Sequence, residues 1–228
     1  MNYIFDTPTP ASVAIHGSDD RFAVRRIFCV GRNYAAHARE MGHNPDCELP
    51  FYFTKPNDAV VDNRVSIPYP PKTNNFHFEA ELVVAIGKEC EDVKREDALQ
   101  HVYGYAVGND LTRRDLQSAA KLKGRPWDVS KAFDHSAPCA EIHPINQISD
   151  IENSRIWLTV NGDIKQDSNI NKLIWSVPEV IANLSTLFKL MPGDLIYTGT
   201  PEGVGPIMKG DVIRVGIEGL TELETKIV

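Results

Sequence analysis

The sequence lacks the features of several large classes of protein. Its 228 residues carry a formal net charge of −7 at pH 7 and contain no basic run, which argues against nucleic acid or an acidic membrane surface as a partner. No apolar run is long enough to span a bilayer, and the N-terminus has neither the basic nor the apolar region of a secretory signal. We therefore expect a cytoplasmic protein without a membrane segment.

Cysteine is also scarce. The chain has four cysteines, Cys29, Cys47, Cys90 and Cys139, which are widely separated and form no C-x-x-C pair. This spacing indicates neither a zinc knuckle nor a disulfide framework, so we expect reduced thiols.

Hydrophobic residues make up 42% of the chain, which at this length is enough for one large core. We expect an N-terminal extension over residues 1–24, followed by a single domain over residues 25–228.

Two carboxylates stand in what otherwise reads as a buried strand, residues 76–87. Alternate residues from Phe76 to Ile86 form one apolar face, whereas Glu79 and Glu81 share the other face with apolar residues that follow them. Because both faces turn apolar beyond Glu81, we expect a strand covered on both sides, with the two glutamates at its wetter end. Such a pair is either solvated beside Lys or Arg, or compensated by a hard divalent ion such as Mg2+, Mn2+ or Ca2+.

A third oxygen ligand follows the next β-prone run. Residues 103–110 are apolar until Asn109 and Asp110, where a polar, helix-like stretch begins. With Glu79, Glu81 and Asp110 as ligands, a metal would keep open positions for water or substrate, as catalytic sites do.

A possible base dyad lies on a short helix predicted over residues 34–41, with Asn33 as its N-cap and Gly42 at its end. His37 and Glu40 are three residues apart and share a helical face, so the carboxylate could fix the imidazole tautomer and raise its basicity. An ordinary exposed His–Glu pair is the alternative.

The segment after this helix has two features relevant to a site. Residues 43–50 are polar and rich in turn formers, as in segments that close over a site. A strand over residues 51–55 then ends at Pro56, and Lys55 faces either an anionic substrate or water.

Further elements are predicted from period and caps. A helix over residues 113–123 is expected to begin after an N-cap at Thr112, and its Arg114 and Gln117 point either toward the metal end of the preceding strand or into solvent. The remaining predictions are a strand over 58–71, a helix over 91–102, an ordered loop over 125–135, a hairpin over 155–166 with a type I′ turn at Asn161–Gly162, and a helix after Ser176 with Val177, Ile181, Leu184 and Phe188 as its apolar stripe.

Residues 195–206 predict a strand that runs into a glycine-rich turn. The exposed backbone N–H groups of such a turn could bind a carboxylate or an oxyanion. The turn lacks the Lys-Ser/Thr pair of a phosphate loop, so nucleotide binding is not expected.

Five blocks in this order resemble the fumarylacetoacetate hydrolase superfamily, and most of all its short acylpyruvate and fumarylpyruvate hydrolases. The resemblance runs from about residue 26 to the end of the chain. It is carried by Gly31–Tyr34 with His37 and Glu40, by Glu79 and Glu81, by Asp110 with Thr112, Arg114 and Gln117, by Lys131, and by Thr198–Pro206.

The resemblance implies an α+β, β-rich fold, a mixed β-roll of packed sheets with peripheral helices, assembled as a homodimer. It implies Mg2+ or Mn2+ bound by Glu79, Glu81 and Asp110, with Ca2+ as a possible substitute. It assigns His37, Glu40 and Lys131 to catalysis, the first two activating water. The residues it assigns to the substrate, a small keto acid, are Arg32, Tyr34, Arg114, Gln117 and Thr200, to which Lys55 is added from its position at the end of a strand.

The implied activity is metal-dependent hydrolysis of a carbon–carbon bond in 2,4-diketo acids, which gives pyruvate and a carboxylic acid. The same chemistry also permits oxaloacetate decarboxylation or tautomerisation, and isomerisation of a hydroxydienoate. A third hypothesis is a metal-stabilised scaffold that binds keto acids without turnover.

Overall fold

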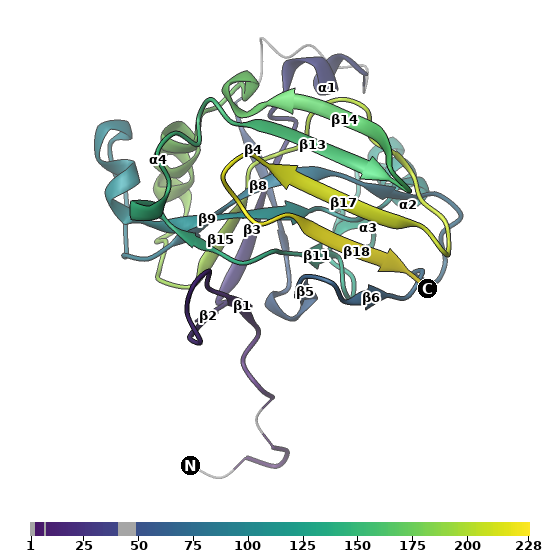
Figure 1. The fold of residues 1–228 in the computed structure, drawn as a ribbon, viewed down its shortest axis with the longest axis horizontal. Helices are drawn as coiled ribbons and strands as arrows, with labels where there is room; N and C mark the ends of the chain where they lie inside the picture. The colour runs from purple at the N-terminus through teal and green to yellow at the C-terminus, as the bar shows by residue number, and fades with distance from the viewer. Residues whose placement is uncertain (1–2, 7, 41–48) are drawn as a thin grey trace.

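A computed structural model describes residues 3–6, 8–40 and 49–228 (Figure 1). Gly42, predicted as the end of the first helix, lies outside the described residues, as does the predicted closing segment up to residue 48. Cys47 lies there as well. The described cysteines Cys29, Cys90 and Cys139 are free and buried, in line with the expectation of reduced thiols.

The fold is α+β and strand-rich, as the sequence predicted. A six-stranded sheet forms its centre, and only β15–β3 pair in parallel among its neighbours. Its order is β12 (His143–Pro144), β9 (Val102–Asn109), β8 (Ala80–Ile86), β15 (Asp194–Tyr197), β3 (Arg26–Gly31) and β4 (Phe51–Lys55).

A five-stranded sheet packs in front of this central sheet in Figure 1. Its order is β14 (Asp163–Asn169), β13 (Arg155–Val160), β17 (Val212–Ile217), β18 (Leu223–Ile227) and β6 (Ser66–Ile67). The β13–β14 hairpin is the predicted one: Asn161 and Gly162 both have positive φ, at 54° and 93°, as a type I′ turn requires.

The main core lies between the two sheets. Leu82, Val84 and Ile86 from β8 belong to the same buried cluster as Ile156 and Val215 from the facing sheet. On the opposite face of β8, Val83 and Ala85 belong to a second buried cluster. The predicted burial of this strand on both faces is therefore confirmed, and every residue of β8 is buried.

An N-terminal hairpin covers part of the second face. Its strands are β1 (Ser12–Ala14) and β2 (Arg21–Ala23), and Val13 reaches the second cluster with 1% of its surface exposed. His16 fixes the hairpin to the body, because its backbone N–H donates to the Ile142 carbonyl at 2.9 Å.

Smaller pairings complete the fold. They are a three-stranded sheet of β10 (Thr112–Arg113), β7 (Phe76–Phe78) and β16 (Gly205–Pro206), and the pair β11 (Ala137–Pro138) with β5 (Val60–Val61). The helices are α1 (Ala35–Glu40), α2 (Arg114–Leu122), α3 (Asp128–Lys131) and α4 (Val177–Leu187), of which α1 and α4 lie at the periphery (Figure 1). The 3-10 helices are Asn57–Ala59, Arg95–His101, Ile145–Gln147 and Ile170–Lys172.

Four predictions of local structure were wrong in part. Residues 76–87 form two strands, not one, because the chain changes sheet at Glu79. Residues 58–71 are not one strand, because the chain turns between β5 and β6 at Arg64, whose φ is 63°. The segment 91–102 contains a 3-10 helix in place of an α-helix. Phe188 follows the end of α4 and is 41% exposed, so it does not continue the buried stripe.

Both predicted N-caps before the functional helices were also wrong. Thr112 lies in β10, and its hydroxyl donates to the Asp110 carbonyl at 3.0 Å, so it does not cap α2. The side-chain oxygen of Asn33 accepts from the Trp175 backbone N–H at 2.8 Å, and its amide donates to the Thr198 carbonyl at 2.8 Å. Asn33 therefore joins β3 to the Thr198 loop.

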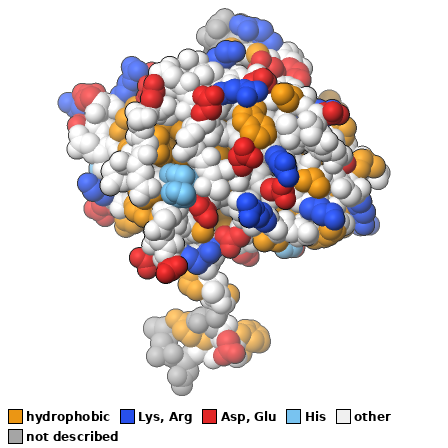
Figure 2. All heavy atoms as spheres, viewed as in Figure 1, with side chains coloured by type: hydrophobic (Ala, Val, Ile, Leu, Met, Phe, Trp, Pro, Cys, Tyr) orange, Lys and Arg blue, Asp and Glu red, His pale blue; other side chains and the backbone are white. Residues whose placement is uncertain are grey.

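None of the described helices combines the length and apolar character that a membrane span needs. Figure 2 shows acidic and basic side chains interleaved over the face that carries the five-stranded sheet, without a large patch of one sign.

Candidate metal centre and catalytic cleft

The change of sheet at Glu79 builds the centre of the site. Glu79 stands between β7 and β8, and its backbone N–H donates to the Asn109 side-chain oxygen at 2.9 Å. In the antiparallel register Ala80 pairs with Asn109, so Asp110 follows directly beside Glu79, and its N–H donates to the Glu79 carbonyl at 2.9 Å. Backbone pairing thus brings together side chains that are about 30 residues apart in sequence.

The three predicted ligands converge. Glu79, Glu81 and Asp110 each offer one carboxylate oxygen, and these atoms lie within 4.8 Å of one another. All three side chains are buried, with exposures of 5%, 2% and 1%. Three anions this close and this dry require compensating positive charge.

Cations from three elements compensate two of the carboxylates. Lys131 Nζ lies 2.7 Å from Glu79 Oε2 and 2.6 Å from Asp110 Oδ2. Arg114 pairs with the other Glu79 oxygen, and Lys55 Nζ lies 2.8 Å from Asp110 Oδ1. Glu79 and Asp110 are therefore each paired with two buried basic groups.

For Glu79 and Lys131, burial and the charged neighbours shift the pKa in opposite directions. Burial by itself would raise the pKa of Glu79, but Lys131 and Arg114 hold it well below its usual range. Burial would lower the pKa of Lys131, but Asp110 and Glu79 raise it. Burial raises the pKa of Glu81, and the neighbouring Asp110 and Glu79 charges raise it further.

Glu81 is the carboxylate whose charge a divalent cation would compensate. Among the described residues no basic side chain forms an ion pair with it, and its one hydrogen-bond donor is the Gly199 N–H, 2.8 Å from Oε2. A hard divalent ion accepts an all-carboxylate oxygen set with positions left open. The residues present therefore fit Mg2+ or Mn2+, with Glu79, Glu81 and Asp110 as the groups that would hold it.

The predicted pairing of His37 with Glu40 forms, and His37 lines the same cleft as the three carboxylates. His37 Nδ1 lies 3.2 Å from Glu40 Oε2, and Glu40 also accepts a long hydrogen bond from the Gly203 N–H. Burial lowers the pKa of His37 below 6.5, while Glu79 and the Glu40 hydrogen bond act in the opposite direction. The imidazole is therefore neutral at pH 7, with Nε2 left to accept a proton.

Most of the other predicted site residues line one cleft. Those that line it are Arg32, His37, Glu79, Glu81, Asp110, Arg114, Gln117, Lys131 and Thr200. Arg114 and Gln117 hence face the carboxylates rather than solvent, and Arg114 Nη1 donates to Gln117 Oε1 at 2.6 Å.

Lys55, Tyr34 and Glu40 are not among the lining residues. Lys55 faces neither water nor the cleft: it is 3% exposed and its ammonium also donates to the Lys131 carbonyl. Lys55 therefore holds Asp110 and the end of α3 in place from the buried side of the site. The Tyr34 hydroxyl is buried, and the nearby Glu81 charge adds to the burial that raises its pKa.

Sequence reasoning missed two kinds of residue. Gln166 is a fully buried connector whose amide oxygen accepts from the Ala80 N–H at 2.9 Å and whose nitrogen donates to Thr200 Oγ1 at 2.9 Å. No local pattern indicates this role. Lys121 and Trp127 line the cleft as well, and for Lys121 the signal was available, because it follows Gln117 by four residues on the same helix face.

A family model described as fumarylacetoacetate (FAA) hydrolase C-terminal matches residues 26–228. The chain belongs to the fumarylacetoacetate hydrolase family. The match spans both large sheets and every residue of the cleft.

Individual members of the family are similar over most of their length. A crystal structure of fumarylpyruvate hydrolase from Pseudomonas aeruginosa in complex with Mn2+ and pyruvate is 51% identical, covers 100% of this chain and 99% of its own, and superposes with a TM-score of 0.98. A fumarylpyruvate hydrolase from Ralstonia sp is 51% identical over 77% of this chain and 91% of its own. A mitochondrial oxaloacetate decarboxylase from Dictyostelium discoideum is 42% identical over 90% of this chain and 94% of its own.

Proposed function

We propose that this chain is a metal-dependent hydrolase that cleaves the C3–C4 bond of acylpyruvates, with fumarylpyruvate as the candidate substrate. The products are pyruvate and a carboxylic acid. The observation that carries the proposal is that His37, which is hydrogen-bonded to Glu40, lines the same cleft as three buried carboxylates. The 51% identity to two fumarylpyruvate hydrolases supports this substrate class.

The proposed cofactor is Mn2+ or Mg2+ held by Glu79, Glu81 and Asp110. When bound, the ion supplies Lewis-acid stabilisation of negative charge that develops at the pyruvate end of the substrate. The P. aeruginosa protein was crystallised with Mn2+ and pyruvate, which supports both the ion and the product.

His37 is the proposed general base. Its Nε2 takes a proton from water, whose oxygen adds to the C4 carbonyl carbon of the substrate. The C3–C4 bond then breaks, its electron pair passes to C3 to form the enolate of pyruvate, and the proton held by His37 returns to C3. Glu40 positions the ring and stabilises its protonated form through Nδ1.

The cations of the cleft bind and balance the substrate. Arg114 and Gln117 lie on one face of α2 and present donors that suit the carboxylate of the pyruvate unit. Lys131 is buried between Glu79 and Asp110, so its ammonium is placed to compensate the enolate charge. Thr200 is oriented by Gln166 and offers its hydroxyl at the same wall.

The test compares pyruvate release from acetylpyruvate, fumarylpyruvate and oxaloacetate by wild type and His37→Ala, with Mn2+, Mg2+ or a chelator. We expect His37→Ala to lower kcat on acylpyruvates roughly 10²- to 10⁴-fold, the usual contribution of a general base, with unchanged Mn2+ binding by calorimetry. His16→Ala removes an exposed histidine of the N-terminal hairpin and serves as the matched control. Near-normal kcat in His37→Ala with Mn2+ bound would disprove this assignment.

Oxaloacetate chemistry is the second candidate, because the oxaloacetate decarboxylase relative matches 90% of the chain. Decarboxylation or tautomerisation needs the enolate but no attacking water. A catalytic efficiency on oxaloacetate above that on every acylpyruvate would favour it. If the metal could be removed without a change of fold, and no keto acid gave a product, the protein would instead be a binding scaffold.

We also propose that residues 25–228 act as one catalytic domain and that the protein is a cytoplasmic homodimer. The family match from residue 26 onward supports the first point, and the buried free thiols of the described residues suit a reducing compartment. Light scattering coupled to gel filtration tests the dimer, which a monomeric mass at working concentration would exclude.

A further inference from the structure

The cleft is chemically divided along its length. Its inner end holds Glu79, Glu81 and Asp110, which are the only carboxylates among the lining residues that the structure describes. Its outer part is lined by Lys121, Arg32 and Trp127, none of which is fully buried. The outer part therefore presents positive charge and an aromatic wall, which no step of the proposed hydrolysis uses.

Helix α2 connects the two ends. Arg114, Gln117 and Lys121 are three and four residues apart, so they lie along one helix face. Arg114 and Gln117 are 7% and 3% exposed, whereas Lys121 is half-buried nearer the mouth. Seven residues of helix advance about 10 Å, so this face can contact an elongated ligand at two separate points, one at Arg114 and one at Lys121.

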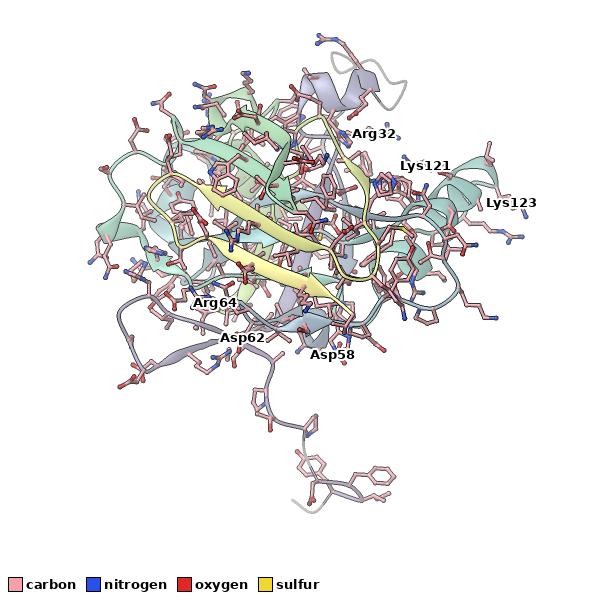
Figure 3. All side chains as sticks on the ribbon, turned by 45° about the vertical axis from the view of Figure 1, so that its right-hand side comes forward. Arg32, Asp58, Asp62, Arg64, Lys121 and Lys123 are labelled. Atoms are coloured by element: carbon pink, nitrogen blue, oxygen red, sulfur yellow. The ribbon has the colours of Figure 1, made fainter. Side chains whose placement is uncertain are left out.

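Lys121 is positioned without an acidic partner. Among the described residues no carboxylate pairs with its ammonium, which lies 5.0 Å from the centre of the Trp127 ring. Burial and the positive charges of Arg114 and Arg32 lower the pKa of Lys121 to about 8. Figure 3 shows Arg32 and Lys121 close together, whereas Lys123 projects at the outer edge. A ligand carboxylate entering beside Lys121 would pair with an ammonium that has no carboxylate partner among the described residues.

The aromatic wall suits the carbon chain of such a ligand. Trp127 packs against Phe51, with ring centres 5.4 Å apart, and against Phe53 at 5.8 Å. Both rings line the cleft: the Phe53 ring centre lies 5.1 Å from Lys131 Nζ, and that of Trp127 lies 5.0 Å from Lys121 Nζ. A flat, conjugated acyl group would contact these rings, while its terminal charge would reach the ammonium.

We infer that Lys121 binds a second carboxylate at the far end of the substrate, and thereby selects acylpyruvates whose acyl group ends in a carboxylate over those that end in a methyl group. This inference rests on the proposed function for its substrate, since fumarylpyruvate carries such a group and acetylpyruvate does not. Lys121 is then a specificity-determining residue with no part in bond breaking.

The kinetic test uses Lys121→Met, which keeps the length and the contact with Trp127 but removes the charge. We expect kcat/KM for fumarylpyruvate to fall roughly 10- to 100-fold, mainly through KM, the range for losing one hydrogen bond to a charged group. Acetylpyruvate should be hydrolysed as by wild type. Lys121→Arg should retain selectivity. Lys123 is an exposed lysine two residues away, and Lys123→Met should leave kcat/KM unchanged for both substrates.

A binding test separates this inference from the hydrolase proposal. Calorimetry on the Mn2+-loaded protein compares 2-oxoheptanedioate with 2-oxoheptanoate, which have equal chain length, lack the C4 carbonyl and differ in the distal carboxylate. We expect wild type to bind the diacid roughly 10- to 100-fold more tightly, and Lys121→Met to lose most of this preference.

Equal affinity of wild type for both ligands would overturn the inference, as would a preference that survives Lys121→Met. Arg125 lies in an adjoining hollow that shares Trp127 and Lys131 with the cleft. The inference would also be overturned if Arg125→Met, and not Lys121→Met, lost the preference for the diacid. A diacid preference that depends on Lys121 in a protein that hydrolyses no acylpyruvate would support the inference and refute the hydrolase proposal.

Discussion

Glu81→Gln should stabilise the metal-free protein and weaken its response to metal. Glu81 is 2% exposed, faces two other carboxylates, and accepts a hydrogen bond from the Gly199 N–H. Glutamine keeps the size and the acceptor oxygen while removing a buried charge without an ion-pair partner among the described residues. Replacing a buried charge of this kind by a neutral group typically gains about 1–3 kcal/mol, and 1 kcal/mol corresponds to about 2–4 °C at this chain length.

The sign of the pH dependence follows from the raised pKa of Glu81, which burial, Asp110 and Glu79 cause. An acid whose pKa is higher in the folded state destabilises that state above its unfolded pKa, which is about 4.3 for glutamate. The cost grows as the pH rises from there toward the folded-state pKa. The advantage of Glu81→Gln should hence be largest near neutral pH and shrink as the pH falls toward about 4.3.

Metal should reverse the order of stability. At a Mn2+ concentration of about 100 times Kd, binding stabilises the folded wild type by about 2.7 kcal/mol. Glu81→Gln replaces one anionic ligand by a neutral amide, so Mn2+ should bind this variant more weakly and stabilise it less. The assay is urea unfolding with chelator and with Mn2+, near neutral pH and at mildly acidic pH.

The control is Glu89→Gln, whose 61% exposed side chain lies 3.5 Å from Lys189 and should change stability by no more than about 0.5 kcal/mol. Two results would refute the reasoning: Glu81→Gln less stable than wild type in chelator near neutral pH, or an equal gain from Mn2+ in both proteins.

Two further predictions concern the dyad and the glycine-rich loop. Burial places the pKa of His37 below 6.5, so kcat/KM of wild type should be lost only as the pH falls below that value. Glu40→Gln removes a hydrogen bond that raises this pKa, so a pH–rate profile should show a lower kcat and an acid limb at still lower pH; an unmoved limb would contradict the pairing. Gly199→Ala would place Cβ 2.7 Å from Asn33 Cβ at a φ of +99°, whereas Gly210→Ala, at +96°, meets no atom within 4 Å. Unfolding in urea should show a cost of about 1–3 kcal/mol for backbone strain in both, with an additional loss of Mn2+ affinity only in Gly199→Ala; equal Mn2+ affinities would contradict the role of the Gly199 N–H.

The sequence by itself determined the parts of this protein that depend on local pattern. The two-residue alternation around Glu79 and Glu81 identified a strand buried on both faces, because apolar period and burial are directly linked. The Asn161–Gly162 turn was predictable because few residue pairs adopt two successive positive φ values. The same local logic failed at Thr112 and Asn33, whose side chains bond to partners across the fold and not to the adjacent helices.

Only the tertiary structure decided how the charges are paired. The position of Lys55 at the end of a strand predicted that it faces water or substrate, but the fold directs its ammonium inward to Asp110. Gln166 joins Ala80 to Thr200 across distant segments, and the outer part of the cleft draws Lys121 and Trp127 from either side of a turn. The physical reason is that a buried charge or amide is satisfied by whichever group packing brings within about 3 Å, and long-range packing leaves no periodic trace in the chain.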